Sequence, residues 1–146
     1  MQVLEIMKTK AFSAKIENLY DMLEFVSLYA RSKNIPAETL NKIILATEEA
    51  LVNIIDYSYP NLEGTIEIIC QSCTEKPGIN VTLKDYGIPF NPIIQSLQKN
   101  HASPPIPHLD ENKRGGYGIY IFVGVMDHVE YKRLENGNLL SLTKYL

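Results

Sequence analysis

The segment formed by residues 43–55, IILATEEALVNII, constrains the fold most, because it is apolar enough to require burial over several helical turns. It nevertheless carries Glu49 and, four residues later, Asn53. A spacing of four residues places two side chains on nearly the same face of a helix. Burying a carboxylate or an amide is costly unless a partner satisfies it. The segment therefore predicts a core helix with one polar face that something else must satisfy.

Two helices are predicted in the first half of the chain. Residues 2–12 form a strand or an extended arm, and Ser13 is a candidate N-cap for a helix that runs to about residue 33. Pro36 suits the first turn of a second helix, which continues to about Tyr59 and stops before the next proline. Apolar residues recur at helical spacing in both segments, so each helix has one face for the core.

Strands are predicted in the second half. Alternating patterns follow Gly64 and the EKPG turn, and residues 129–146 form a hairpin with Asn136-Gly137 as its turn. Helices and hairpins are grouped, which favours an α+β fold, a two-layer sandwich of a mixed or antiparallel sheet with helices on one face. The inward-facing residues of the first two of these strands are expected to be Ile66, Ile68, Cys70, Ile79, Val81, Leu83 and Asp85.

The polar segment 91–116, with SPPIPH at its centre, is long for a loop in a compact domain. Such loops are usually lids or disordered, and a lid is expected here. RGGYG at its end opens a helix that is expected to reach about Asp127. No repeat or linker divides the chain, so residues 1–146 are expected to form a single domain.

Composition and charge exclude several classes of function. The net charge is −3 with no basic block, so nucleic acid is not expected as a partner. No apolar run is long enough to span a membrane, and the N-terminus does not resemble a signal peptide, so a cytoplasmic protein is expected. Cys70 and Cys73 form one C-x-x-C without the second ligand pair that zinc needs, and chance spacing is favoured over redox or metal chemistry.

Three stretches carry candidate chemistry. They are the pair Glu49 and Asn53, the strand-ending DYGIPF at residues 85–90, and the glycine-rich RGGYG at residues 114–118. A helix that begins among glycines offers free N–H groups and a positive dipole end, which suit phosphate. Taken singly, each has an ordinary explanation, respectively a solvated helix face, a turn and a helix cap. Their order and spacing in one chain are more informative.

Together, ATEEALVNIIDYSYP, LKDYGIPFNP and RGGYGIYIFVGVMDHVEY resemble the N, G1 and G2 boxes of the GHKL ATPases. This superfamily includes gyrase, heat-shock chaperones, sensor histidine kinases and mismatch-repair proteins. The chain is most similar to its anti-sigma-factor serine/threonine kinases, which act in bacterial partner-switching systems. The likeness runs from about residue 10 to the C-terminus. It implies a Bergerat ATP-binding fold with a lid, and ATP and Mg²⁺ as cofactors.

The resemblance also implies roles for residues of the first two boxes. Asn53 would hold Mg²⁺ through its carbonyl oxygen. One such ligand can suffice, because this hard cation prefers oxygen and keeps several waters. Asp85 would accept a hydrogen bond from the adenine amino group, where guanine presents a carbonyl instead. Gly87 would leave room for the base. Glu49 would be the general base that accepts the proton of the attacking hydroxyl, and the competing choice, Glu48, lies about 100° further round the helix.

The third box would supply the lid. By the same resemblance, Arg114 would stabilise the terminal phosphate, and glycines would let the lid backbone wrap the phosphates. These glycines are Gly115, Gly116 and Gly118. One departure stands out: many members of this branch have a histidine four residues after the asparagine, and here that residue is Tyr57, which carries no positive charge near neutral pH.

The resemblance implies a kinase that also binds a regulatory protein. It would sequester a sigma factor, or another output protein, and phosphorylate an antagonist of STAS-type fold. Homodimerisation is common in the branch and would use the first strand and first helix. The alternative is an ATP-binding interaction module without phosphotransfer. A sensor histidine kinase domain is disfavoured, because the first helix carries no phosphoacceptor histidine.

Overall fold

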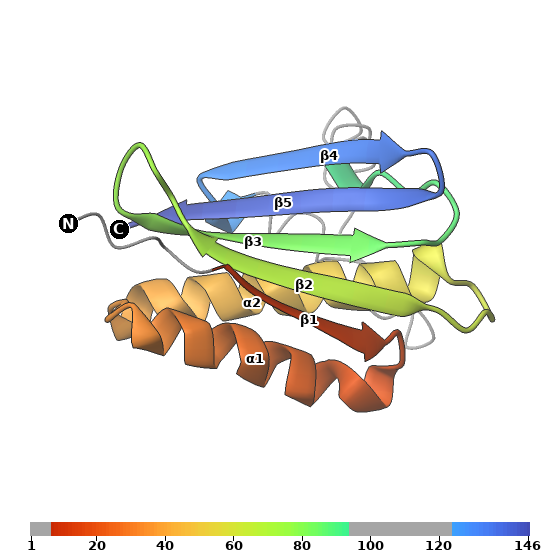
Figure 1. The fold of residues 1–146 in the computed structure, drawn as a ribbon, viewed down its shortest axis with the longest axis horizontal. Helices are drawn as coiled ribbons and strands as arrows, with labels where there is room; N and C mark the ends of the chain where they lie inside the picture. Colours follow the sequence, from red (N-terminus) through yellow and green to blue (C-terminus); the bar gives the residue numbers. More distant parts are fainter. Residues whose placement is uncertain (1–6, 94–123) are drawn as a thin grey trace, which may run out of the picture.

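The computed structural model describes residues 7–93 and 124–146, which form one antiparallel sheet with two helices packed on one face (Figure 1). The strand order is β1-β2-β3-β5-β4, and every neighbouring pair is antiparallel. This confirms the predicted α+β sandwich. The elements in chain order are β1 (Lys8–Ser13), α1 (Leu19–Ser32), α2 (Ala37–Asn53), β2 (Thr65–Ser72), β3 (Gly78–Asp85), β4 (His128–Leu134) and β5 (Gly137–Tyr145).

Some predictions lie outside the described residues. They include the lid, apart from its first three residues, and the start of the helix predicted after RGGYG. Residues 124 and 125 are helical and β4 begins at His128, which agrees with the predicted end of that helix. Within the described residues, no helix is both long and apolar enough to cross a membrane.

The start of the first helix differs from the prediction. Ser13 is the last residue of β1 and caps nothing; a 3₁₀ turn, η1 (Ile16–Asn18), precedes α1. The Asn18 side chain donates to the Ser13 carbonyl oxygen at 3.0 Å. Pairing with β2 holds Ser13 in the strand, opposite Thr65, so sheet register overrides its capping preference.

The end of α1 is set by local backbone chemistry. Asn34 has φ 58°, and its N–H donates to the Arg31 carbonyl, while Ile35 N–H donates to the Ala30 carbonyl. This is the Schellman arrangement, in which asparagine is one of the few residues that tolerate the left-handed conformation. Pro36 then caps α2, close to its predicted position.

The second helix changes character at its C-terminal end. It is α-helical to Asn53 and continues as a π-helical turn, η2 (Ile54–Ser58), before Tyr59. The predicted extent is therefore right, but the regular α-helical geometry expected for the last turn is wrong. Single π turns widen the helix and are frequent at functional sites. Here the π turn begins immediately after Asn53.

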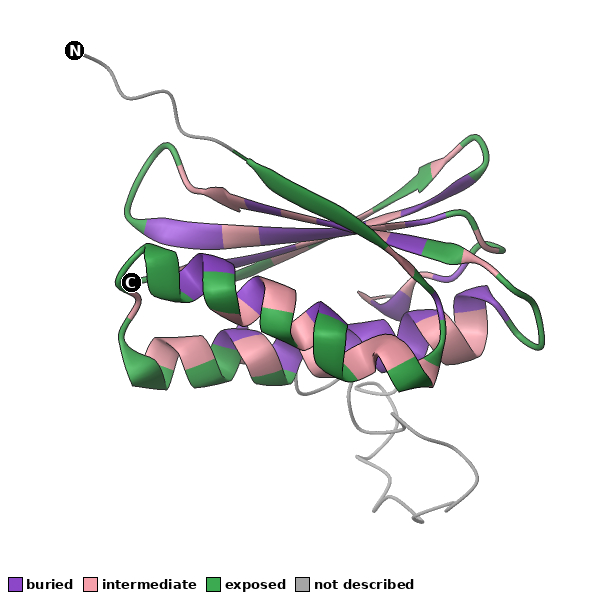
Figure 2. Ribbon diagram, turned by 60° about the horizontal axis from the view of Figure 1, so that its bottom comes forward, coloured by how far each residue is buried: buried purple, intermediate pink, exposed green. Residues whose placement is uncertain are grey.

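The core lies between the helices and one face of the sheet. Figure 2 shows buried residues along the strands and on the sides of α1 and α2 that face them. Thr47, the polar residue at the centre of α2, is satisfied by donating to the Ile43 carbonyl oxygen at 2.7 Å. The largest fully buried side chains include Met22, Val26, Ile43, Leu51, Ile66, Ile68, Ile79, Val81, Leu83 and Leu142. The inward faces predicted for β2 and β3 are confirmed.

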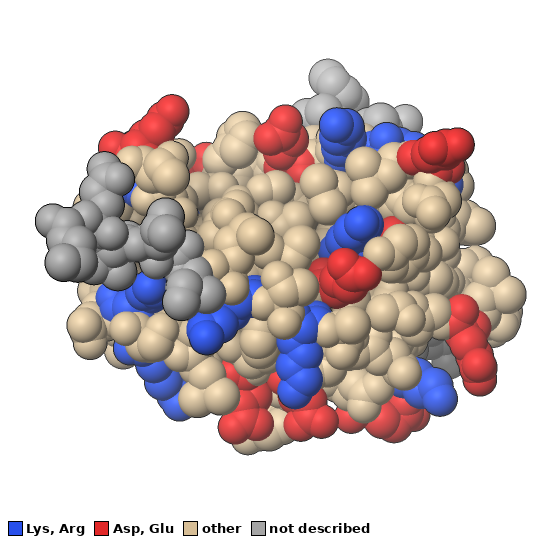
Figure 3. All heavy atoms as spheres, viewed as in Figure 1, with Lys and Arg blue, Asp and Glu red and all other residues tan. Residues whose placement is uncertain are grey.

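The opposite face of the sheet is left open by the described helices. On the face seen in Figure 3, acidic and basic side chains are both present and are separated by uncharged surface. That distribution is unlike a continuous basic surface for nucleic acid.

The C-terminal hairpin has a different turn from the predicted one. Leu134 pairs with Gly137, so the turn residues are Glu135 and Asn136 rather than Asn136 and Gly137. Gly137 belongs to β5, where a Cβ atom would overlap the carbonyl oxygen of Asp85. The close approach of β3 therefore explains this glycine, and the tertiary contact overrides the usual Asn-Gly turn.

We predict that Gly137→Ala lowers the free energy of unfolding by about 1–3 kcal/mol, the usual effect of overpacking, because the obstructing atom is backbone and cannot rotate away. Urea unfolding measures this. Gly124→Ala is the matched control, since its Cβ would meet nothing within 4 Å, and it should stay within about 1 kcal/mol of the parent. Equal stability of the two variants would contradict the close approach.

Candidate functional site

Asp85 is the most deeply buried ionisable group at the edge where β3 ends, with 1% of its surface exposed. Alternation along β3 turns it to the same side as Val81 and Leu83, as predicted. Its Oδ1 accepts two hydrogen bonds, from Gly87 N–H and from Asn138 Nδ2, each at 2.9 Å. Both of these bonds reach Oδ1, and among the described residues no further bond of standard geometry reaches the carboxylate, although the nearby Ser58 hydroxyl also lowers its pKa. Oδ2 is therefore the oxygen open to another donor.

Asn138 organises the surroundings of this carboxylate. It lies directly opposite Asp85 in the β3–β5 register, and its Nδ2 also donates to the Ile88 carbonyl oxygen at 2.8 Å. Its Oδ1 accepts the Phe90 N–H at 3.3 Å and the Tyr131 hydroxyl. One carboxamide thus connects β4, β5 and the loop that follows β3.

Burial raises the pKa of Asp85 above its ordinary value, while the bonds from Asn138 and Gly87 and the charge of Arg133 oppose that rise. Arg133 also donates to the Gly87 carbonyl oxygen at 2.9 Å, on the exposed side of the same loop. The carboxylate is therefore desolvated but oriented, as a group that recognises a ligand through one free oxygen needs to be.

The loop after β3 is held against the π turn. Ile88 N–H donates to the Ser58 carbonyl oxygen at 3.0 Å, and a Cβ on Gly87 would overlap that same oxygen. The Ser58 backbone therefore fills the space where a side chain on Gly87 would lie, and the expected role of Gly87 in leaving room for a base stays a prediction. The Tyr59 hydroxyl accepts Tyr86 N–H at 2.6 Å and donates to the Thr65 carbonyl oxygen. Tyr59 therefore also connects the end of the second helix to the loop after β3.

Asn53 is 1% exposed, and neither its Oδ1 nor its Nδ2 has a hydrogen-bond partner among the described residues. An unpaired buried amide is unfavourable by about 1–3 kcal/mol for each lost partner, so native structures rarely keep one without a reason. An oxygen ligand that is buried, neutral and unpaired fits the requirements of a hard divalent cation. The residues present are therefore compatible with a magnesium-bound ligand.

Glu49 lies one helical turn before Asn53 and is half-buried. Burial raises the pKa of its carboxyl group, and the neighbouring charge of Glu48 raises it further. A raised pKa improves a carboxylate as a proton acceptor near neutral pH. Glu48 is half-buried too, so exposure does not separate the two candidates and the choice rests on spacing.

Tyr57, the residue at the position where histidine is common, stacks on Phe90 with ring centroids 5.0 Å apart and planes 19° from parallel. The phenol therefore packs as an aromatic surface beside the Asp85 loop. Arg114, Gly115, Gly116 and Gly118 lie outside the described residues, and their roles stay predictions.

The sequence analysis missed Asn138, Tyr131 and Ser58. A weak signal existed for Asn138, a polar residue at an inward position of the last strand, in GNLLSL. Its partner could not be inferred, because pairing with Asp85 depends on the register between strands more than 50 residues apart.

The C-x-x-C pair is not part of this site. Cys70 and Cys73 are not joined by a disulfide, and burial raises the pKa of the Cys70 thiol to about 12, which keeps it protonated and unreactive at neutral pH. Within residues 7–93 and 124–146, no group of three or more His, Cys, Asp or Glu residues could hold a metal ion. Chance spacing therefore remains the better interpretation.

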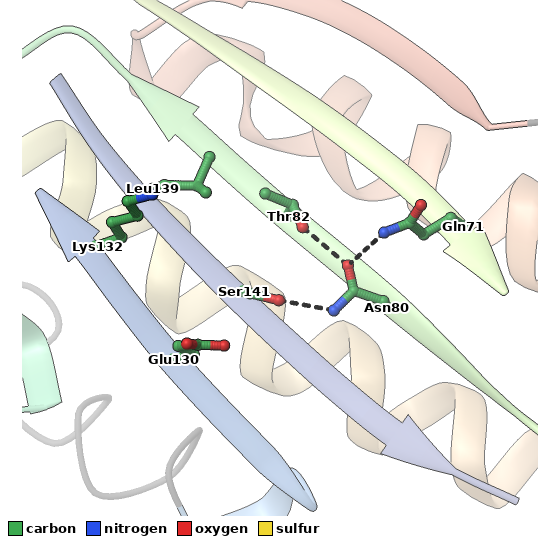
Figure 4. Close-up of a pocket in the computed structure, with 7 residues that line it drawn as sticks. All are labelled: Gln71, Asn80, Thr82, Glu130, Lys132, Leu139 and Ser141. Carbon is green, nitrogen blue, oxygen red and sulfur yellow. Dashed lines mark hydrogen bonds between the residues drawn. The ribbon is translucent and has the colours of Figure 1, made fainter. Parts of the chain in front are cut away.

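A separate hollow lies on the open face of the sheet, away from Asp85 (Figure 4). Four of its polar side chains bond to one another: Asn80 accepts from Gln71 and Thr82 and donates to Ser141. Unlike Asn53, these four side chains have partners without a ligand.

Comparison with known proteins identifies the domain. The model of the histidine kinase-like ATPase domain family matches residues 12–144. The chain belongs to this family. Membership confirms the resemblance of the three motifs to the GHKL ATPases and is consistent with the α+β sandwich.

The chain is also similar to several curated proteins that share one name. Serine-protein kinase RsbW of Halalkalibacterium halodurans is 29% identical over 109 residues, covering 75% of this chain and 64% of that protein. Proteins of the same name from Bacillus cereus and Bacillus thuringiensis are 28% identical over 102 residues, covering 70% of this chain and 61% of each relative. The match therefore spans less than two thirds of the length of these relatives.

We predict that Asp85→Asn is at least as stable as the parent at neutral pH. The amide oxygen can still accept from Gly87 and Asn138, and the desolvated charge is removed. Because the folded-state pKa of Asp85 is raised above 3.8, its contribution to stability is present at acidic pH and is lost as pH rises through the folded pKa.

The advantage of Asp85→Asn should therefore shrink as pH falls into the carboxyl range, as urea unfolding at pH 7 and near pH 4 would show. A variant that is less stable than the parent at pH 7 would contradict a net penalty from burying this carboxylate.

Proposed function

We propose that this protein binds ATP with Mg²⁺ and transfers the γ-phosphoryl group to a serine or threonine hydroxyl of a partner protein. The observation that supports this most is the unpaired, buried amide of Asn53, one helical turn from a carboxylate with a raised pKa, in a domain of an ATPase family. A polar pair of this kind in a core helix is expected where a ligand completes it.

Asn53 holds the metal in this proposal through its Oδ1. One amide would suffice, because Mg²⁺ keeps several waters. Bound Mg²⁺ would neutralise part of the charge of the phosphates. Asn53 would position the metal at the C-terminal end of α2.

Asp85 selects the base. Its Oδ1 is occupied by Gly87 and Asn138, so Oδ2 accepts from the amino group of adenine. A carboxylate can only accept, and the carbonyl of guanine would face it with like polarity. Asn138 is the positioning residue that keeps this oxygen directed at the ligand.

Glu49 accepts the proton of the attacking hydroxyl. Its partly desolvated carboxylate takes up that proton more readily than an exposed one would. Arg114 and the lid glycines Gly115, Gly116 and Gly118 complete the proposal at the terminal phosphate and along the phosphate chain.

The proposed partners follow from the relatives named serine-protein kinase. The phosphoacceptor is an antagonist of STAS-type fold, and the second partner is a sigma factor or another output protein. Such a kinase would work in the cytoplasm as a homodimer and would regulate transcription without contacting nucleic acid.

Asn53→Ala should weaken ATP binding in the presence of Mg²⁺ by about tenfold or more, the usual effect of losing a bond to a charged group. It should change ATP binding in excess EDTA little. Calorimetric titration in both conditions measures the difference. Because the amide is unpaired without ligand, the variant should unfold at nearly the parent's urea concentration. Equal losses with and without Mg²⁺ would argue against a metal ligand.

Glu49→Gln should reduce phosphoryl transfer about 10²–10⁴-fold while ATP affinity changes only a few-fold, because the amide cannot accept a proton. Incubation with Mg-ATP and a STAS-type antagonist, followed by detection of phosphoserine, measures transfer. Glu48→Gln is the matched control and should retain activity.

The same assay tests the alternative function, which Tyr57 favours because it replaces an ionisable histidine. If the parent binds ATP tightly but no antagonist is phosphorylated, the protein is an ATP-dependent interaction module, and Glu49→Gln would then change nothing.

A further inference from the structure

We infer that Ser58 is a specificity-determining residue whose hydroxyl donates to N1 of the adenine ring, beside the carboxylate oxygen of Asp85. The inference rests on the proposed nucleotide site. It adds a residue that lies within the first of the three stretches but was given no role there. Ser58 and Asp85 would then read the two neighbouring polar atoms of one base edge.

The first support is an unsatisfied donor. Ser58 is 1% exposed, and its Oγ has no hydrogen-bond partner among the described residues. The only other buried side-chain atoms in this condition within that part of the chain belong to Asn53. Thr47, by contrast, sits in the same helix and satisfies its hydroxyl on a backbone carbonyl. Ser58 is therefore unusual in not using the local acceptor that a helical hydroxyl ordinarily finds.

The second support is position. The Ser58 carbonyl accepts Ile88 N–H, and Gly87 packs directly on that carbonyl, so the π turn and the Asp85 loop are held together. The Ser58 hydroxyl lies close enough to the Asp85 carboxylate to lower its pKa as a hydrogen-bond donor does, yet no bond of standard geometry satisfies its Oγ. The hydroxyl and the carboxylate are thus neighbours.

The third support is the chemistry of the base. The Watson–Crick edge of adenine presents an amino donor next to N1, which is an acceptor, and proteins that read single bases bond to this edge. A carboxylate that accepts, next to a hydroxyl that donates, is complementary to this pair. Guanine and hypoxanthine present an acceptor and then a donor, so both contacts would be mismatched.

The test is a pair of double-mutant cycles in which the ligand is also changed. Parent and Ser58→Ala are titrated by calorimetry, with Mg²⁺, against ATP and against 1-deaza-ATP, in which N1 is replaced by C–H. In the parent, loss of N1 should weaken binding about 3–10-fold, the range for one neutral hydrogen bond. In Ser58→Ala, ATP should bind about as weakly as 1-deaza-ATP, because the donor is already absent.

The matched control is Asp85→Asn, tested with purine riboside triphosphate, which lacks the 6-amino group. This variant should lose the preference for the amino group and keep the effect of N1. Urea unfolding of Ser58→Ala checks that the fold is intact.

Three outcomes would overturn the inference. Ser58→Ala could bind ATP as the parent does, could lose the same factor for ATP and 1-deaza-ATP, or could retain the full effect of N1. If the parent bound no adenine nucleotide at all, the proposed function itself would fail. If Asp85→Asn behaved as expected and Ser58→Ala did not, only the role of Ser58 would fail.

Discussion

A single carboxamide-to-carboxylate hydrogen bond, from Asn138 to Asp85, connects the parts of this molecule that matter for its proposed activity. The two residues face each other across β3 and β5, and both are buried. Asn138 also binds the loop after β3 and receives the Tyr131 hydroxyl from the edge strand. A buried polar network of this kind is favourable only when its members are satisfied, so it restricts β4, β5 and the loop to one arrangement.

The satisfied network makes the few unsatisfied atoms more informative. Among the described residues, the buried unpaired side-chain atoms lie on Asn53 and Ser58, at the two ends of one π turn. Groups of this kind destabilise the ligand-free protein. Their concentration in one short segment, whose last residue bonds to the loop after β3, is what a site completed by a polar ligand would show. Stability is given up locally while the core around it is closely packed.

The comparison between β2–β3 and the C-terminal hairpin shows how far sequence patterns can be taken. Alternation correctly assigned the inward faces of β2 and β3, including Asp85, because side chains in a strand must alternate. The Asn-Gly turn was placed one residue too late, because Gly137 is needed where the backbone of Asp85 passes close to β5. Ser13 failed as a cap for a similar reason, since its pairing with β2 holds it in a strand.

The amino-acid sequence by itself determined the α+β class, the two amphipathic helices, the inward position of Asp85 and the pairing of Glu49 with Asn53 on one helix face. These follow from periodicity and spacing, which depend on neighbours within a few residues. Only the tertiary structure decided that Asn138 holds Asp85, that Gly87 packs on Ser58, and that the amide of Asn53 and the hydroxyl of Ser58 are buried without partners. Those facts depend on contacts between segments far apart in the chain, and sheet register and packing, not local propensity, select them.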